Sequence, residues 1–136
     1  MKSYCTIFLL LMVACGGNHR KEIRARDGAL RVELRDDNER FDTVRMGRAR
    51  DGEMLVGKFY VVNNSGEPMV ITDVVTGCGC TVVDYDKKAI GAGEERLFNF
   101  SFDTRGRAGY QLKGIDIIDS RQRVARILIE AEVLIK

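Results

Sequence analysis

The stretch "EERLFNFSFDT", residues 94–104, alternates apolar and polar side chains more clearly than any other part of the chain. Three aromatic side chains share one face of this stretch: Phe98, Phe100 and Phe102. A period of two is typical of a β-strand with one buried face, and each phenylalanine buries a large apolar area on that face. We therefore predict a strand that lies at the centre of the hydrophobic core.

Five further segments show strand-like alternation: residues 29–35, 53–62, 68–76, 112–119 and 123–135. Turn-forming residues separate them, as in the run from Asn63 to Gly66, and Pro68 is expected at the first position of the strand that follows. Helical patterns are almost absent, and each strand must bury one face against a second sheet. We predict an immunoglobulin-like antiparallel β-sandwich of about seven strands, with a barrel as the alternative.

The length and charge of the chain limit its class. Its 136 residues suffice for one hydrophobic core. The 22 basic and 20 acidic residues nearly cancel, which leaves no strong positive field to attract nucleic acid. We predict a single folded domain with no nucleic-acid partner.

The first fifteen residues, "MKSYCTIFLLLMVAC", contain an apolar run from Ile7 to Ala14 that is too short to span a bilayer. This run is typical of a secretion signal. Its end resembles a bacterial lipobox, with a small residue before Cys15, although Met12 stands where leucine is usual. We predict a signal peptide over residues 1–14 and lipidation of Cys15. Ordinary cleavage nearby, with Cys15 discarded or free, is the alternative.

Residues 15–28 are polar, carry charges of both signs and show no apolar period. We interpret them as the lipidated cysteine and a flexible linker, followed by the folded domain over residues 29–136. We expect His19, the single histidine, to be solvated within this linker. Since acyl chains hold a protein firmly on a membrane, we predict a lipid-anchored protein of the bacterial cell envelope, on a periplasmic or outer-membrane face.

Two of the four cysteines, Cys78 and Cys80, lie in "VVTGCGCTVVDY", residues 74–85. In an extended strand their side chains would share a face, which would bring the two sulfur atoms together. Four interpretations are open: a strained disulfide, with Gly79 adopting unusual backbone angles; a copper(I) site that Met69 could join; a covalent link to another chain; and free thiols packed beneath a bend of the strand.

The sequence gives little sign of catalysis. The predicted domain has no histidine to serve as a base, no GxSxG motif and no phosphate-binding glycine loop. Five carboxylates are candidates for an acid and base pair: Asp84, Asp86, Asp103, Asp116 and Asp119. Acids at strand ends and turns are usually solvated, so we predict no catalytic residues, no cofactor and no enzymatic activity.

Several of these features occur in an order that resembles the bacterial family called domain of unknown function 1573, of envelope proteins of the Bacteroidetes type. The similar pieces are an Asn64 to Gly66 turn, the Cys-Gly-Cys-Thr signature at residues 78–81, and the strand end at Asp103 and Thr104. Gly77 stands where the family usually has serine, and "IGAG", residues 90–93, lacks the family's proline. The resemblance covers residues 41–136. It implies an immunoglobulin-like fold related to interaction modules of centrosomal and ciliary proteins, and it implies no activity.

These inferences together predict a membrane-anchored envelope lipoprotein. Its immunoglobulin-like module would bind or support an envelope protein or glycan, without catalysis, through a sheet edge or the end loops. The alternative is a thiol-based redox or copper(I)-handling protein that uses Cys78 and Cys80. The sequence predicts no oligomeric state.

Overall fold

The computed structural model describes residues 21–24, 28–37 and 39–135, and this part of the chain folds into nine β-strands without a helix. The strands are β1 (Glu22–Arg24), β2 (Leu30–Glu33), β3 (Phe41–Arg50), β4 (Met54–Val62), β5 (Ile71–Thr76), β6 (Thr81–Tyr85), β7 (Glu95–Asp103), β8 (Gly109–Asp119) and β9 (Val124–Leu134). Within these described residues, no helix could span a membrane.

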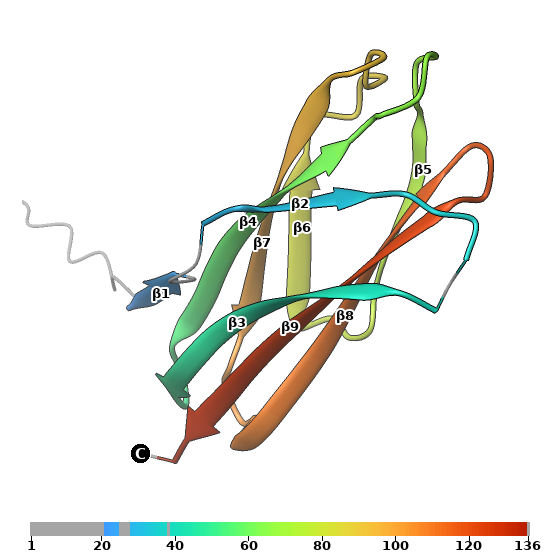
Figure 1. Cartoon of the computed structure of the whole chain (residues 1–136). Helices are drawn as coiled ribbons and strands as arrows, with labels where there is room; N and C mark the ends of the chain where they lie inside the picture. Colours follow the sequence, from blue (N-terminus) through green and yellow to red (C-terminus); the bar gives the residue numbers. More distant parts are fainter. Residues whose placement is uncertain (1–20, 25–27, 38, 136) are drawn as a thin grey trace, which may run out of the picture.

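The strands form two sheets that pack face to face (Figure 1). The first sheet has the order β1-β4-β7-β6, with β2 also paired to β4, and the second has the order β3-β9-β8-β5. In this arrangement β4, β7 and β6 take the places of strands B, E and D of an immunoglobulin domain, and β9, β8 and β5 take those of G, F and C. The predicted immunoglobulin-like β-sandwich is confirmed.

The core lies between the two sheets, and the strand of residues 94–104 runs through its centre. Phe98 and Phe102 are completely buried, Phe100 is nearly so, and all three face the second sheet as predicted. The ring of Phe59 on β4 stacks on that of Phe98, with centroids 5.3 Å apart, and the ring of Tyr85 on β6 stacks on the other side at 4.4 Å. The aromatic residues therefore tie three strands of one sheet together.

The sheets are not antiparallel throughout, and this differs from the prediction. Strands β1 and β2 pair with β4 in parallel, and β3 pairs with β9 in parallel. Strand β3 therefore lies at the edge of the second sheet, and the chain then crosses to β4 in the first sheet. Hydrophobic periodicity identifies the buried face of a strand and carries no information about the direction of its neighbour, so the pattern could not show these parallel pairs.

Two strands of the sandwich, β3 and β6, were missing from the predicted set. Strand β3 buries Val44, Met46 and Ala49, but a β-bulge at Gly47, where φ is +73°, shifts the alternation by one residue. A bulge places an extra residue in one strand, which hides the period of two in the sequence. Strand β6 has only five residues and begins directly after the cysteines.

The start of β5 also differs from the prediction. The strand begins at Ile71, so Pro68 lies before it in a connecting loop. Met69, one residue further on, is buried and forms an isolated bridge with Ile90. A buried residue with both backbone groups paired explains the apolar pattern around Pro68, which resembles that of a strand.

The N-terminal predictions fall mostly outside the described residues. The predicted signal peptide of residues 1–14, the lipidated Cys15 and His19 all lie there. Within the predicted linker of residues 15–28, β1 pairs with the beginning of β4, and the Met54 N–H donates to the Lys21 carbonyl at 3.1 Å. The chain therefore joins the sandwich at Lys21, before the predicted domain boundary at Ala29.

Candidate functional site

The Cys-Gly-Cys signature lies in the short crossover that carries the chain from one sheet to the other. Strand β5 is the outermost strand of the second sheet, β6 is the outermost strand of the first, and only residues 77–80 connect them. These residues form a bend and a turn, with the Thr81 N–H donating to the Cys78 carbonyl at 3.3 Å. The segment is therefore not extended, in contrast to the geometry from which the proximity of the sulfur atoms was predicted.

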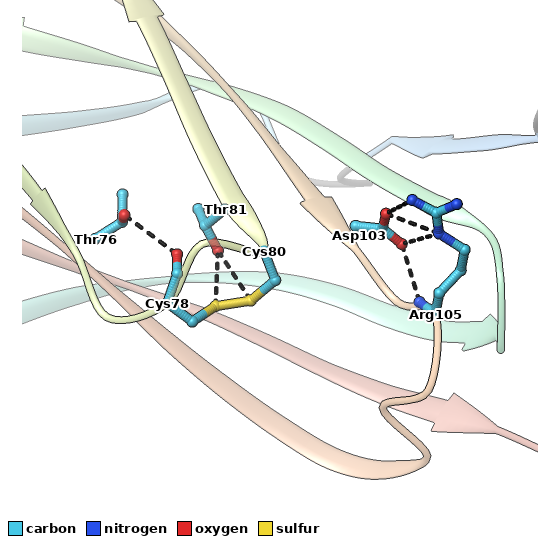
Figure 2. The surroundings of a disulfide bond; sticks show 6 residues. All are labelled: Thr76, Cys78, Cys80, Thr81, Asp103 and Arg105. Atoms are coloured by element: carbon cyan, nitrogen blue, oxygen red, sulfur yellow. Dashed lines mark hydrogen bonds and ion pairs between the residues drawn. A yellow bond between two sulfur atoms is a disulfide. The ribbon is translucent and has the colours of Figure 1, made fainter.

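Cys78 and Cys80 form a disulfide across this turn, with their Cα atoms 5.3 Å apart (Figure 2). The Thr81 hydroxyl lies 3.9 Å from each of the two sulfur atoms, and the Thr76 hydroxyl donates to the Cys78 carbonyl at 3.3 Å. Backbone bonds anchor both ends, because the Gly77 N–H donates to the Gly114 carbonyl on β8 and the Asp103 N–H donates to the Cys80 carbonyl. The crossover is thus tied to both sheets and closed by a covalent bond.

Of the four interpretations that the sequence left open, the structure has the intrachain disulfide. Cys80 is 7% exposed and belongs to the core, whereas Cys78 is half-buried at its margin. The pair therefore contributes to packing, but as a cystine and not as two free thiols. Among the described residues no group of three or more His, Cys, Asp or Glu side chains could hold a metal ion. Met69, the suggested copper ligand, is buried beyond the opposite end of β5.

The two glycines of the crossover are not needed for an unusual backbone conformation, which the sequence suggested for Gly79. Neither Gly77 nor Gly79 has a positive φ, so the turn does not need the conformations that only glycine adopts readily. A Cβ atom on Gly79 would meet nothing within 4 Å, and one on Gly77 would make only ordinary contact with the Gly114 backbone. A serine therefore fits at position 77, as the resemblance to the family implies.

An open hollow of about 320 Å³ adjoins the disulfide, lined by Gly79, Cys80, Asp103, Arg105 and Arg107. The Arg105 guanidinium donates to both carboxylate oxygens of Asp103, with the shortest contact at 2.6 Å (Figure 2). This ion pair fixes Asp103 as a hydrogen-bond acceptor. The hollow therefore contains the disulfide next to the Asp103–Arg105 ion pair. Its lining has no further carboxylate that could complete an acid and base pair.

The five candidate carboxylates do not gather into one site. Asp116 on β8 forms a two-point ion pair with Arg126 on the neighbouring β9. Asp119 is buried in the β8–β9 turn, where it accepts hydrogen bonds from the backbone and the guanidinium of Arg123. Asp84 and Asp86 are exposed around the far end of β6. These acids are therefore held in separate structural contacts or lie in solvent.

Among the described residues, three side chains with a carboxyl or phenol group have a shifted pKa, each for a local reason. The Arg50 N–H donates to the Glu53 carboxylate at 2.7 Å and lowers its pKa, and Lys21 adds to the effect. The Lys88 N–H similarly lowers the pKa of Asp86. Burial raises the pKa of Tyr85, and the charge of Asp73 raises it further, so this phenol stays neutral. Each shift follows from a turn or from packing and not from a cluster of titratable groups.

The structure assigns a role to two buried polar residues that the sequence analysis missed. Asn63 is 1% exposed, and its amide donates to the carbonyls of Glu67, Ile90 and Gly91. Thr104 is completely buried, and its hydroxyl lies 2.5 Å from the Glu53 carbonyl and accepts from the Gly52 N–H. Each residue holds two distant loops together. The sequence signal for Asn63 is its position directly after an apolar strand, which favours local side-chain hydrogen bonds.

The sandwich and its disulfide-closed crossover define an immunoglobulin-like β domain of two sheets. The chain belongs to the family described as "Protein of unknown function (DUF1573)", whose model matches residues 39–133. The match begins just before β3 and ends within β9, so it covers the seven strands of the sandwich proper.

Two solved structures are similar to this chain in fold. One is described as a protein of unknown function from Porphyromonas gingivalis W83, with a TM-score of 0.57 and 21% identity, covering 68% of this chain and 44% of that one. The other is the secreted serine protease VesC from Vibrio cholerae, with a TM-score of 0.53 and 10% identity, covering 66% of this chain and 21% of that one. The chain thus spans less than half of either protein. No match was found among curated proteins.

Proposed function

We propose that this protein is a non-catalytic binding module of the bacterial cell envelope, anchored through lipid on Cys15. Its surface for a protein partner is the side of the sandwich formed by β5 and β6. The observation that carries the proposal is that these two strands, joined by the disulfide-closed crossover, are both outermost in their sheets. Outermost strands present unpaired backbone groups, to which an extended segment of a partner can add as a further strand.

The surface of these strands supports this use. Val82 on β6 is 61% exposed and Val75 on β5 is 46% exposed, so each edge carries an apolar side chain that faces outward. No other strand among the described residues pairs with the outer edge of β6. On the other side of the first sheet, by contrast, β1 and β2 cover β4. An added strand would gain backbone hydrogen bonds together with contacts to Val82 or Val75.

The non-catalytic part of the proposal rests on the separation of the candidate acids. Asp103, Asp116 and Asp119 each bind an arginine, and these ion pairs lie on different elements of the sandwich. A hydrolase of the glycosidase type needs two carboxyl groups that face each other across one cleft. The described residues offer no such pair near the disulfide.

A lysine at an edge position tests this proposal. Val82→Lys places a charge on the exposed face of β6, where it opposes strand addition without disturbing the core. Leu112→Lys is the matched control, because Leu112 is 47% exposed on β8, an interior strand. We expect cross-linking in the envelope to link the wild type and the control to the same partner, with the Val82→Lys variant losing most of the product. Equal cross-linking by all three proteins would contradict binding at this edge.

A second candidate function is thiol-disulfide exchange, which the position of Cys78 at the margin of the core favours, since Cys78 is only half-buried whereas Cys80 is buried. The co-reactant would be a protein dithiol. Its thiolate would attack the Cys78 sulfur, breaking the bond to Cys80, and Cys80 would leave as a thiolate and take up a proton. The second thiol of the partner would then displace Cys78. The partner would leave as a disulfide, and this chain would hold two thiols, a transfer of two electrons and two protons.

The reduction potential distinguishes this second candidate from a structural disulfide. Equilibration with glutathione buffers, followed by acid quench and alkylation, measures the fraction reduced. A midpoint above about −250 mV would support exchange in the envelope, whereas a midpoint below about −300 mV is typical of structural disulfides and would contradict it.

A further inference from the structure

We propose that the end of the sandwich that bears the disulfide docks on anionic phospholipid head groups. In this orientation the β5–β6 edge extends outward from the membrane surface. This inference rests on the proposed lipid anchor at Cys15. The observations that carry it are the position at which the chain enters the fold and the unbalanced positive charges at that end.

Three connections meet at this end: the β3–β4 turn, the β5–β6 crossover and the β7–β8 loop (Figure 1). Hydrogen bonds join them, since the Gly106 N–H donates to the Asp51 carboxylate at 2.7 Å and the Asp103 N–H donates to the Cys80 carbonyl at 2.9 Å. The chain enters the sandwich at the same place, because Lys21 pairs with Met54 and Glu53 directly after the β3–β4 turn.

The length of the tether keeps this end close to the lipid. Lys21 lies six positions after Cys15, and six positions span at most about 20 Å even when the chain is fully extended. A lipidated Cys15 therefore holds the basic end within about 20 Å of the membrane surface, roughly two Debye lengths at physiological salt. The opposite end of the sandwich cannot come as near unless the domain turns over on this tether.

The charges at this end favour a negative surface. Four basic side chains lie at this end against three acidic ones: Lys21, Arg50, Arg105 and Arg107 against Asp51, Glu53 and Asp103. Asp103 pairs with Arg105 and Glu53 pairs with Lys21, while Asp51, which accepts from the Gly106 N–H, keeps its charge. Arg50 and Arg107, in contrast, have no ion pair with any described carboxylate, and Arg50 is exposed. Each basic side chain near an anionic leaflet contributes about 1 kcal/mol of attraction.

The opposite end has no such excess of positive charge, because acids offset its two exposed lysines, Lys87 and Lys88. Three exposed acids in the loop before β3 have no ion pair among the described residues: Asp36, Asp37 and Glu39. An anionic surface therefore attracts the end that bears the disulfide more strongly than the opposite end. The positive end could attract either lipid or an acidic protein. We favour lipid, because the tether brings this end to the membrane in every copy of the molecule.

The test uses the mature chain as purified from bacterial membranes, placed in nanodiscs of phosphatidylcholine alone or mixed with phosphatidylglycerol, with a gadolinium ion on some head groups. Relaxation of two glycine amides in turns reports orientation: Gly106 at the basic end and Gly93 at the other. We expect Gly106 to relax several-fold faster than Gly93 in anionic discs, with the difference lost at high salt. Arg50→Gln with Arg107→Gln should reduce the docked population about tenfold. The control variant, Lys87→Gln with Lys88→Gln, removes the same charge at the far end and should not change it.

The outcomes separate the two proposals. If the protein fails to remain on neutral discs, the lipid anchor is absent, and both the anchor and the docking are wrong. If it remains on both kinds of disc but Gly106 and Gly93 relax equally, the anchor stands and the docking is wrong. Equal loss of orientation in the two double variants would also contradict the proposal, because the effect would then depend on net charge and not on this end.

Discussion

Two connections between the sheets are held by different means, and the difference shows which one stabilises the fold. The loop after β4 is held by buried Asn63, whose amide donates to three carbonyls from two segments. The crossover after β5 is held by the Cys78–Cys80 disulfide, which closes a ring of only three residues. A cross-link stabilises a protein by restricting the unfolded chain, and a ring this small restricts it little. The hydrogen-bonded connection should therefore contribute more than the covalent one.

The largest effect should follow from Asn63→Ala. This change removes three hydrogen bonds that join two segments, each worth about 0.5–1.5 kcal/mol, and the cavity left by the buried amide adds to the loss. We expect the free energy of unfolding to fall by about 3–5 kcal/mol in urea denaturation. Asn64→Ala is the control, because Asn64 is the exposed neighbour and should change stability by less than about 0.5 kcal/mol. Similar losses of unfolding free energy from both variants would contradict this role of the buried Asn63 amide.

Reduction of the disulfide should have a smaller effect. The chain-entropy relation gives about 1.5 kcal/mol for a three-residue ring, against about 3 kcal/mol for a ring of fifteen. We expect urea denaturation of the reduced wild type to give a free energy of unfolding about 1–2 kcal/mol below that of the oxidised protein. The protein should stay folded when reduced. Unfolding on reduction alone would mean that the disulfide stabilises the fold more than the hydrogen bonds of Asn63 do.

The smallest effect should come from Glu53→Gln at the β3–β4 turn. The pKa of Glu53 is lowered in the folded protein by the Arg50 N–H and Lys21, so its contribution is present at neutral pH and is lost as the pH falls below about 4.3 through the lowered pKa. The urea midpoint of the variant should be slightly below that of the wild type at pH 7, and the difference should shrink progressively as the pH falls below about 4.3. Glu39→Gln, at an exposed residue, should show no such convergence.

The sequence predicted those parts of the fold in which packing repeats without interruption. The phenylalanines of β7 and the alternating residues of β9 identified the core correctly, because burial on one face produces a period of two. Strand β3 was missed because the bulge at Gly47 breaks that period. The parallel pairing of β3 with β9 depends on contacts between segments about eighty residues apart, which periodicity does not record.

The candidate site was predicted less completely than the fold. The sequence identified Cys78 and Cys80 as the only candidate thiols of the domain but left four interpretations open, because two cysteines separated by one residue are compatible with each of them. The sequence considered an extended strand for the paired sulfur atoms and a bend for free thiols; the structure combines the disulfide with the bend, since residues 77–80 form a turn. The roles of Asn63 and Thr104 depend on carbonyls brought from other loops, so they became visible only in three dimensions.

The state of the two cysteines is the most direct test of the central claim, a disulfide-closed crossover between two outermost strands. The measurement is the intact mass of the purified mature chain after alkylation in denaturant, with and without prior reduction. We predict no alkylation of Cys78 or Cys80 before reduction and alkylation of both after it, while a lipid mass on Cys15 reports the anchor separately. Alkylation of both cysteines in denaturant without reductant would mean that they are free thiols packed in the core, and would contradict the claim.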